Sequence, residues 1–255
     1  MVRAMPPACW PGPYRFLRRA TPIMASKTAM ERWTKVLSRD ETARLVKLLA
    51  PVSRDGHVLD VGCGYGRKLD VLSRLGFKNL TGVERNQIVA ESTRTRGYKV
   101  IASDLFDFEK EHEKYDCVVF SHIIEHFQHD DLLSFLDDYL DCLKPGGHAV
   151  ILAPLPGAHF YLDFDHVKPY CPQSLTTVFG PGQRQIQERS RNVLCMEDVD
   201  FRRSPWRVRF NRALMLKTKA AFWPRFANLV FALLFKGSGK ICGRSTGWLG
   251  LFSKQ

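Results

Sequence analysis

The sequence predicts an α/β protein with a doubly wound, mostly parallel sheet, and two observations carry this prediction. Apolar, strand-like runs alternate with helical stretches from residue 57 to residue 154, and the first run ends in a glycine-rich turn. Alternating strands and helices are typical of a Rossmann-like sheet that helices cover on both faces. A basic and apolar C-terminal extension follows this region. Ligands of such sheets bind at the carboxyl ends of the strands, where we expect the functional residues.

The first predicted strand, residues 57–61, leads directly into Gly62, Gly64 and Gly66. Glycine is needed where the backbone takes a positive φ or where a Cβ atom would block a ligand. The turn therefore indicates that a nucleotide-like ligand lies against bare backbone. A dinucleotide-binding turn would need its third glycine at position 67, which is Arg67, so the register argues against a nicotinamide-dependent dehydrogenase.

Acidic and polar residues close the strands that follow. Glu84 ends the second strand, twenty residues beyond Gly64, where the hydroxyls of a ribose need a carboxylate acceptor. Asp104 ends the third strand, and Ser121 ends the fourth. The predicted strands are residues 57–61, 80–84, 98–104, 115–121 and 148–154, and the predicted helices are residues 29–49, 67–75, 132–143 and one that opens at Pro172.

The glycine turn and the strand ends together resemble the class I S-adenosylmethionine-dependent methyltransferases, in particular the group that includes ubiquinone and menaquinone methylases. The motifs occur in that family's order and spacing over residues 52–175. The resemblance implies S-adenosylmethionine as the cofactor. It places the methionine and ribose portions of the cofactor on the glycine turn, at Asp60, Gly62, Gly64 and Gly66, and the ribose hydroxyls on Glu84 at the end of the second strand. It places the adenine beside Asp104 and Leu105 at the end of the third strand, and the methionine end beside Ser121 and His122 at the end of the fourth.

A long polar and aromatic loop follows the fifth strand, at residues 159–175. Loops of this length without secondary structure are usually functional. Its core resembles the Asp-x-x-His-x-Arg-Pro-aromatic loop of many family members, with Lys168 in place of the commoner arginine. The resemblance implies that His166, Lys168 and Tyr170 bind the methyl acceptor.

Three histidines are candidates for a catalytic base: His166, His122 and His126. A histidine has an ordinary pKa near 6.5, so at neutral pH it can accept the proton of an acceptor hydroxyl. His166 is our first choice, although it could instead brace the loop with a hydrogen bond, and His126 could cap or pack a helix. The predicted function is methylation of a hydroxyl oxygen on a small-molecule, glycan or lipid-linked acceptor. The alternatives are an inactive, cofactor-binding interaction module and a methyltransferase that acts on nucleic acid.

Cysteine usage bears on metal sites and on the compartment. The seven cysteines are scattered, odd in number and without a Cys-x-x-Cys spacing. We therefore expect neither a disulfide framework nor a bound metal, and a reducing compartment fits this pattern. The predicted location is the cytoplasm, with the protein either free or held peripherally at the inner face of the membrane.

The net charge of +12 is concentrated at the C-terminus, because residues 202–255 contain twelve lysines and arginines and no acid. These bases alternate with aromatic residues, so an anionic membrane surface is the expected partner, and nucleic acid is the less favoured one. The apolar run at residues 227–235 is too short to span a bilayer. It could lie in the membrane interface with Arg225, Lys236 and Lys240 at its ends, or pack on the sheet.

The predicted organisation has three parts. Residues 1–27 form a flexible arm rich in proline and arginine, residues 28–203 form the methyltransferase domain, and residues 204–255 form the basic aromatic extension.

Overall fold

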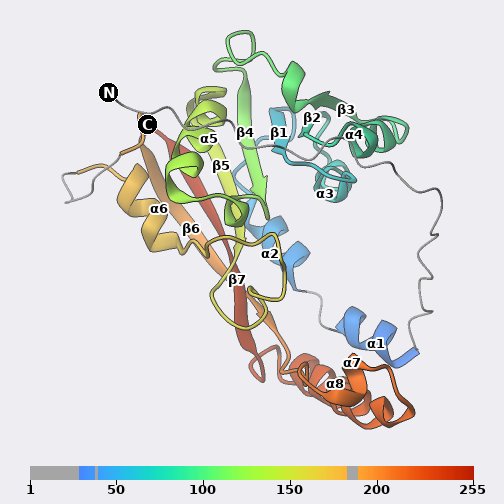
Figure 1. The fold of residues 1–255 in the computed structure, drawn as a ribbon. Coiled ribbons are helices and arrows are strands. Elements are labelled where there is room, and N and C mark those ends of the chain that lie inside the picture. Colours follow the sequence, from blue (N-terminus) through green and yellow to red (C-terminus); the bar gives the residue numbers. More distant parts are fainter. Residues whose placement is uncertain (1–28, 38–39, 183–188) are drawn as a thin grey trace, which may run out of the picture.

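The computed structural model describes residues 29–37, 40–182 and 189–255, and the predicted N-terminal arm lies outside these ranges. The described chain forms one seven-stranded sheet in the order β3-β2-β1-β4-β5-β7-β6 (Figure 1). The first five strands in sequence run parallel to one another, whereas β7 runs antiparallel to both β5 and β6. The strands are β1 (His57–Val61), β2 (Asn79–Glu84), β3 (Lys99–Ala102), β4 (Tyr115–Ser121), β5 (Leu143–Pro154), β6 (Leu194–Ser204) and β7 (Arg244–Lys254).

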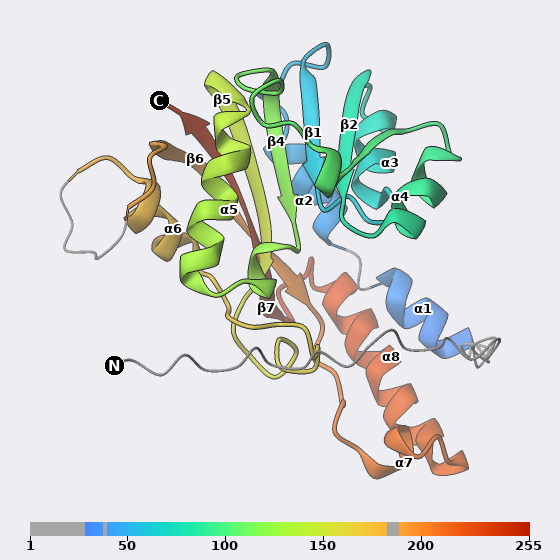
Figure 2. The same cartoon turned by 45° about the horizontal axis from the view of Figure 1, so that its top comes forward.

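Helices cover both faces of the sheet, as expected for a doubly wound fold (Figure 2). Helices α5 and α6 lie on one face, and α2, α3 and α4 lie on the other. The α-helices are α1 (Ala29–Leu37), α2 (Glu41–Leu48), α3 (Arg67–Arg74), α4 (Gln87–Arg94), α5 (His129–Asp141), α6 (Pro172–Phe179), α7 (Arg212–Met215) and α8 (Phe222–Gly237), and the 3₁₀ turns are η1 (Ser103–Leu105), η2 (Ile124–His126) and η3 (Lys219–Ala221).

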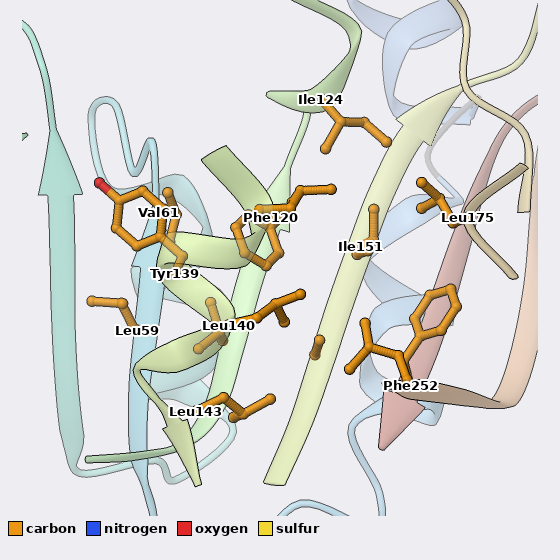
Figure 3. Packing of buried hydrophobic residues seen from close by; sticks show 14 of the residues in the cluster. Leu59, Val61, Phe120, Ile124, Tyr139, Leu140, Leu143, Ile151, Leu175 and Phe252 are labelled. Atoms are coloured by element: carbon orange, nitrogen blue, oxygen red, sulfur yellow. The ribbon is translucent and has the colours of Figure 1, made fainter. Parts of the chain in front are cut away.

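The core consists of two layers because successive residues of a strand point to opposite faces of the sheet. Leu59 and Phe120 pack with α5 on one face, and Figure 3 shows them beside Ile151 and Phe252. Their strand neighbours on the other face pack with α2 and α3. These strands are apolar throughout since both faces are covered.

Most predicted elements are confirmed, with three differences in their bounds. The strand predicted at residues 148–154 begins earlier, at Leu143, which is already paired with Tyr115, so the helix predicted over residues 132–143 ends at Asp141. The third strand ends at Ala102, and the single helix expected over residues 29–49 is two helices, α1 and α2. A helix that the sequence analysis did not predict, α4, joins β2 to β3.

The structure also corrects the predicted C-terminal extension. Residues 204–255 are not one appended unit, because β7 lies inside the sheet between β5 and β6. Trp248 and Phe252 of β7 are each at most 1% exposed. The sheet therefore includes β7 near the C-terminus, and of residues 204–255 only residues 205–243 and Gln255 lie outside it.

Residues 205–243 form the β6–β7 insertion, which begins after Ser204 and ends before Arg244, a paired position. Gly247, close to the start of β7, is paired with Pro154, the last residue of β5. The insertion, which ends just before β7, therefore lies near the carboxyl end of β5. Its helix α8 packs beside α1, and both helices lie below the sheet in Figures 1 and 2. None of the helices in the described part of the chain combines the length and apolar character needed to cross a membrane.

Candidate functional site

The glycine turn after β1 has the backbone that its sequence predicts. Gly62 and Gly64 have φ values of 69° and 52°, in the region that favours glycine. A Cβ atom at Gly64 would meet nothing within 4 Å, so its backbone faces open space. At Gly66 a Cβ would come within 2.9 Å of Thr93 Cγ2 in α4. Packing against α4 therefore explains Gly66, and its assignment to the cofactor stays a prediction.

Glu84 is held at the end of β2 by two backbone N–H groups. Gly64 N donates to Glu84 Oε2 at 2.9 Å, and Asn86 N donates to Oε1 at 2.8 Å. Each carboxylate oxygen keeps a second lone pair for another donor. The glycine turn and the strand-two acid, predicted separately from the sequence, thus form one hydrogen-bonded unit.

Asp60 lies beneath this unit with its carboxylate isolated from solvent. The residue is 1% exposed, and neither carboxylate oxygen accepts a hydrogen bond from any residue in the described ranges. Burial raises the pKa of Asp60 to about 7; Lys68 opposes the rise and Glu84 adds to it. A buried carboxylate without a partner is costly, and it fits a ligand that brings positive charge, such as the ammonium group of S-adenosylmethionine.

A cavity of about 580 Å³ opens at the carboxyl ends of β1, β2 and β4. Gly62, Glu84 and His126 all line it, together with Ser103 and Ile123. Residues predicted to hold the cofactor and a residue predicted to act on the acceptor therefore share one space.

The predicted adenine contacts lie beside a separate hollow. Asp104 and Leu105 belong to the turn η1, and the Leu105 side chain is 74% exposed. Gln87 Nε2 is 3.5 Å from Asp104 Oδ2. Leu105 lines this hollow with residues of α4, such as Ile88, whereas Ser121 stands half-buried at the end of β4. An exposed apolar side chain beside an exposed carboxylate is a suitable surface for an adenine ring and its amino group.

His122 stands at the end of β4 between two carboxylates. Its Nδ1 is 3.1 Å from Glu125 Oε1, and its Nε2 is 3.0 Å from Glu41 Oε2. Burial disfavours the charged, protonated ring and by itself would lower the pKa of His122. The hydrogen bonds to Glu125 and Glu41 favour the charged ring more strongly, so the pKa of His122 is raised. Its φ of 57° is unusual for a non-glycine residue, so the surroundings hold it firmly. Because carboxylates engage both of its ring nitrogens, His122 is poorly placed to take a proton from an acceptor.

The other two histidines meet because the loop after β5 folds back over η2. Val167 N donates to Glu125 O at 2.8 Å, which fixes the loop on this turn. The centroids of the His126 and His166 rings are then 5.1 Å apart, although the two residues are forty positions apart in the sequence. His126 Nδ1 donates to Asp165 O at 2.9 Å, and His166 Nδ1 donates to Phe160 O at 3.0 Å. Both rings therefore carry a proton on Nδ1 and keep Nε2 for another partner.

The remaining predicted acceptor residues lie elsewhere. The Tyr170 hydroxyl donates to Phe127 O at 3.0 Å, and the Lys168 ammonium lies 5.4 Å from the centroid of the Tyr170 ring. Both residues line a second cavity, of about 460 Å³, against α5 and α6. The structure does not bring Lys168 and Tyr170 to the histidine pair, and their role toward an acceptor stays a prediction.

Two carboxylates that the sequence analysis did not assign organise the site. Glu41 of α2 contacts His122, Lys68 and Arg202, and Arg202 Nη1 donates to it at 2.5 Å. Burial alone would raise the pKa of Glu41, but His122 and Lys68 hold it well below its usual range. Glu125 is fully buried between His122 and His126. The only sequence signal for Glu125 is its place within His122-x-x-Glu125-His126; nothing local to Glu41 reveals its partners.

The comparisons with known proteins agree with this geometry. The sequence model of a family described as a methyltransferase domain matches residues 30–194, which is more than half of the chain. No curated protein matches the sequence.

Solved structures share the fold at low sequence identity. A S-adenosylmethionine-dependent methyltransferase from Archaeoglobus fulgidus is 21% identical, with a TM-score of 0.54 over 84% of this chain and 93% of that one. The structure described as "Conversion of a Disulfide Bond into a Thioacetal Group during Echinomycin Biosynthesis" is 18% identical, with a TM-score of 0.53 over 88% of this chain and 84% of that one. The MccD protein is 13% identical, with a TM-score of 0.56 over 85% of this chain and 97% of that one. The chain belongs to the methyltransferase-domain family and is a class I S-adenosylmethionine-dependent methyltransferase.

Proposed function

We propose that this methyltransferase acts on a hydroxyl oxygen of a small-molecule, glycan or lipid-linked acceptor. The observation that carries the proposal is the single cavity lined by Gly62, Glu84 and His126, because it joins the cofactor residues to a histidine with a free Nε2. S-adenosylmethionine supplies a sulfonium methyl group that is transferred by in-line displacement. The residues around the cavity have to align the acceptor and exclude water.

A hydroxyl acceptor must also lose its proton, and the histidine pair supports that step. His166 is the better placed of the two for proton chemistry because its side chain is only 13% exposed and is fixed through Nδ1. Within the described ranges its Nε2 makes no hydrogen bond; Glu125 Oε1 and Asp163 Oδ2 stand 4.0 and 3.7 Å away, beyond hydrogen-bond distance. We assign His166 the acceptor side of the site, with His126 beside it at the cavity wall.

The acceptor class can be tested with S-adenosylmethionine carrying an isotopically labelled methyl group. The full chain is incubated with a cell lysate that has been split into lipid and aqueous phases, and labelled products are identified by mass spectrometry. We expect an alkali-stable methyl ether, with the lipid phase as its main source. Label confined to RNA would favour the nucleic-acid alternative, and cofactor binding without transfer to any fraction would favour the inactive interaction module.

We further propose that the β6–β7 insertion binds an anionic membrane surface and presents the site to a lipid-linked acceptor. Exposed apolar side chains gather on α7 and α8, with Trp223 71% exposed and Leu234 55% exposed. The insertion contains no acid, and its exposed bases are Arg212, Lys217, Lys219 and Lys236. Basic interfacial helices combine these two properties. Arg225 and Lys240 are engaged instead with Glu31 and Asp40.

The double variant Lys217→Glu, Lys219→Glu should weaken binding to anionic vesicles at least tenfold at low salt. Each base near such a surface contributes about 1 kcal/mol, and reversal adds repulsion. Vesicle sedimentation measures the effect. Lys47→Glu, Lys110→Glu is the matched control, because it makes the same charge change at exposed lysines outside the insertion.

Wild-type protein and the control variant should sediment equally with anionic vesicles, and both should lose binding in high salt. Equal binding by both double variants would show that the insertion is not the contact. Removal of the C-terminus is unsuitable for this test, since it would remove β7 from the sheet.

A further inference from the structure

Glu125, His126 and His166 form a cluster that neither the cysteine pattern nor the family resemblance led us to expect. One carboxylate oxygen and one nitrogen from each histidine lie within 4.8 Å of one another. The two histidines come from different segments, η2 and the loop after β5, and the loop is fixed to η2 through the backbone of Glu125. The cluster lies next to the cavity, because His126 lines its wall.

Apart from His122 Nδ1, which lies 3.1 Å from Glu125 Oε1, the described residues place only acceptor atoms in the cluster. Both histidines give their Nδ1 proton to a backbone carbonyl, so in the neutral rings each Nε2 holds a lone pair. Glu125 is fully buried, and its Oε2 has no hydrogen-bond partner within the described residues. Three electron-rich atoms that converge in this way repel one another unless a positive group lies among them.

We propose that this cluster binds one divalent transition-metal ion, with Zn²⁺ as the best match. Two imidazole nitrogens and one carboxylate oxygen make up a donor set of catalytic zinc sites, which keep an open position for water or substrate. Donation of Nδ1–H to a carbonyl is also the usual arrangement behind a metal-bound histidine. Tetrahedral bonds of about 2.0–2.1 Å place the donors about 3.3 Å apart, so the side chains have to close inward on binding.

The inference deepens the proposed function and rests on it at one point, the removal of the hydroxyl proton. A cation at this place would bind the acceptor hydroxyl and lower its pKa, so the proton leaves to solvent before or during transfer. The oxygen then forms its bond to the methyl carbon as the sulfur–methyl bond breaks, and the sulfur keeps that electron pair. No change of oxidation state is needed. In this arrangement His166 acts by holding the cation rather than by taking the proton itself.

The test is metal binding to the tag-free full chain after chelation and dialysis. Co²⁺ is titrated and followed by its visible absorption, and then displaced with Zn²⁺. We expect one Co²⁺ per chain, with affinity reduced at least tenfold in His126→Ala and in Glu125→Gln. His112→Ala, at an exposed histidine outside the cluster, is the matched control and should bind as wild type does.

Binding of S-adenosylhomocysteine reports whether each variant is folded and whether the proposed function stands. The metal proposal is overturned if His126→Ala, which changes an exposed residue, binds Co²⁺ as tightly as wild type while it still binds S-adenosylhomocysteine. It is also overturned if metal-stripped enzyme transfers methyl groups at the full rate in the presence of a chelator. Failure to bind S-adenosylhomocysteine at all would instead count against the methyltransferase reading, whatever the metal result.

Discussion

His166→Ala should lower the turnover of methyl transfer about a hundredfold or more. General-base catalysis contributes about 10²–10⁴ to a rate, and loss of a metal ligand would remove activation of the same hydroxyl. Cofactor affinity should change little, since we assign His166 to the acceptor, and it does not belong to the glycine turn. Steady-state kinetics with the identified acceptor, together with calorimetry of S-adenosylhomocysteine binding, measures both quantities.

The control for this variant is His112→Ala, which removes an exposed histidine elsewhere on the surface. It should leave both quantities unchanged. A His166→Ala protein that no longer binds S-adenosylhomocysteine would assign His166 to bracing the loop through its bond to Phe160 O. Full turnover in a folded variant would remove His166 from the reaction altogether.

Asp60→Asn should have opposite effects on stability and on cofactor binding. Burial raises the pKa of Asp60 to about 7, so between about pH 4 and pH 7 the folded chain holds a proton that the unfolded chain has lost. The free energy of unfolding of the ligand-free protein therefore falls as pH rises through this window. Asparagine has the shape of the protonated acid and cannot ionise, so the variant avoids this loss.

Ligand-free Asp60→Asn should exceed wild type in free energy of unfolding by about 4 kcal/mol at pH 8 and by only about 1.5 kcal/mol at pH 5. Urea denaturation at the two pH values measures this. The same variant should bind S-adenosylhomocysteine more weakly at pH 8, by about 1.5–3 kcal/mol, because a charged hydrogen-bond partner is lost.

Asp198→Asn, at an exposed acid on β6, should alter neither property. If Asp60→Asn retains wild-type affinity at pH 8, the carboxylate does not contact the cofactor. If its stability gain is the same at both pH values, ionisation of Asp60 is not the cause.

The elements that the sequence predicted correctly are those whose signal is local. The strands β1 and β4 are continuous apolar runs because both of their faces are covered, and their bounds are close to those predicted. The strand β7 was missed since Gly247 and Gly250 interrupt its apolar pattern. The structure explains both glycines: a Cβ at Gly247 would lie 2.9 Å from Ala153 O, and one at Gly250 would lie 2.7 Å from the Phe252 ring.

In the part of the site that we assign to the acceptor, the sequence likewise revealed what is local and not what depends on contacts between distant segments. Sequence reasoning identified the three histidines by type and position, but it could not rank them by their surroundings. Contacts with Glu41 and Glu125 keep the proton on His122, and one of these partners is 81 residues away. Folding of the loop onto η2 engages Nδ1 of both His126 and His166 and leaves each Nε2 without a hydrogen bond to any other residue that the structure describes.

The sequence by itself determined the fold class, the cofactor and the residues at the strand ends. These depend on short motifs, and a parallel sheet necessarily brings its strand ends to one edge. Only the tertiary structure decided which carboxylates meet which histidines, that Asp60 is buried with no hydrogen-bond partner among the described residues, and that the last strand completes the sheet between β5 and β6. The physical reason is that burial and pairing between distant segments arise from packing, and no local pattern in the chain specifies the partner.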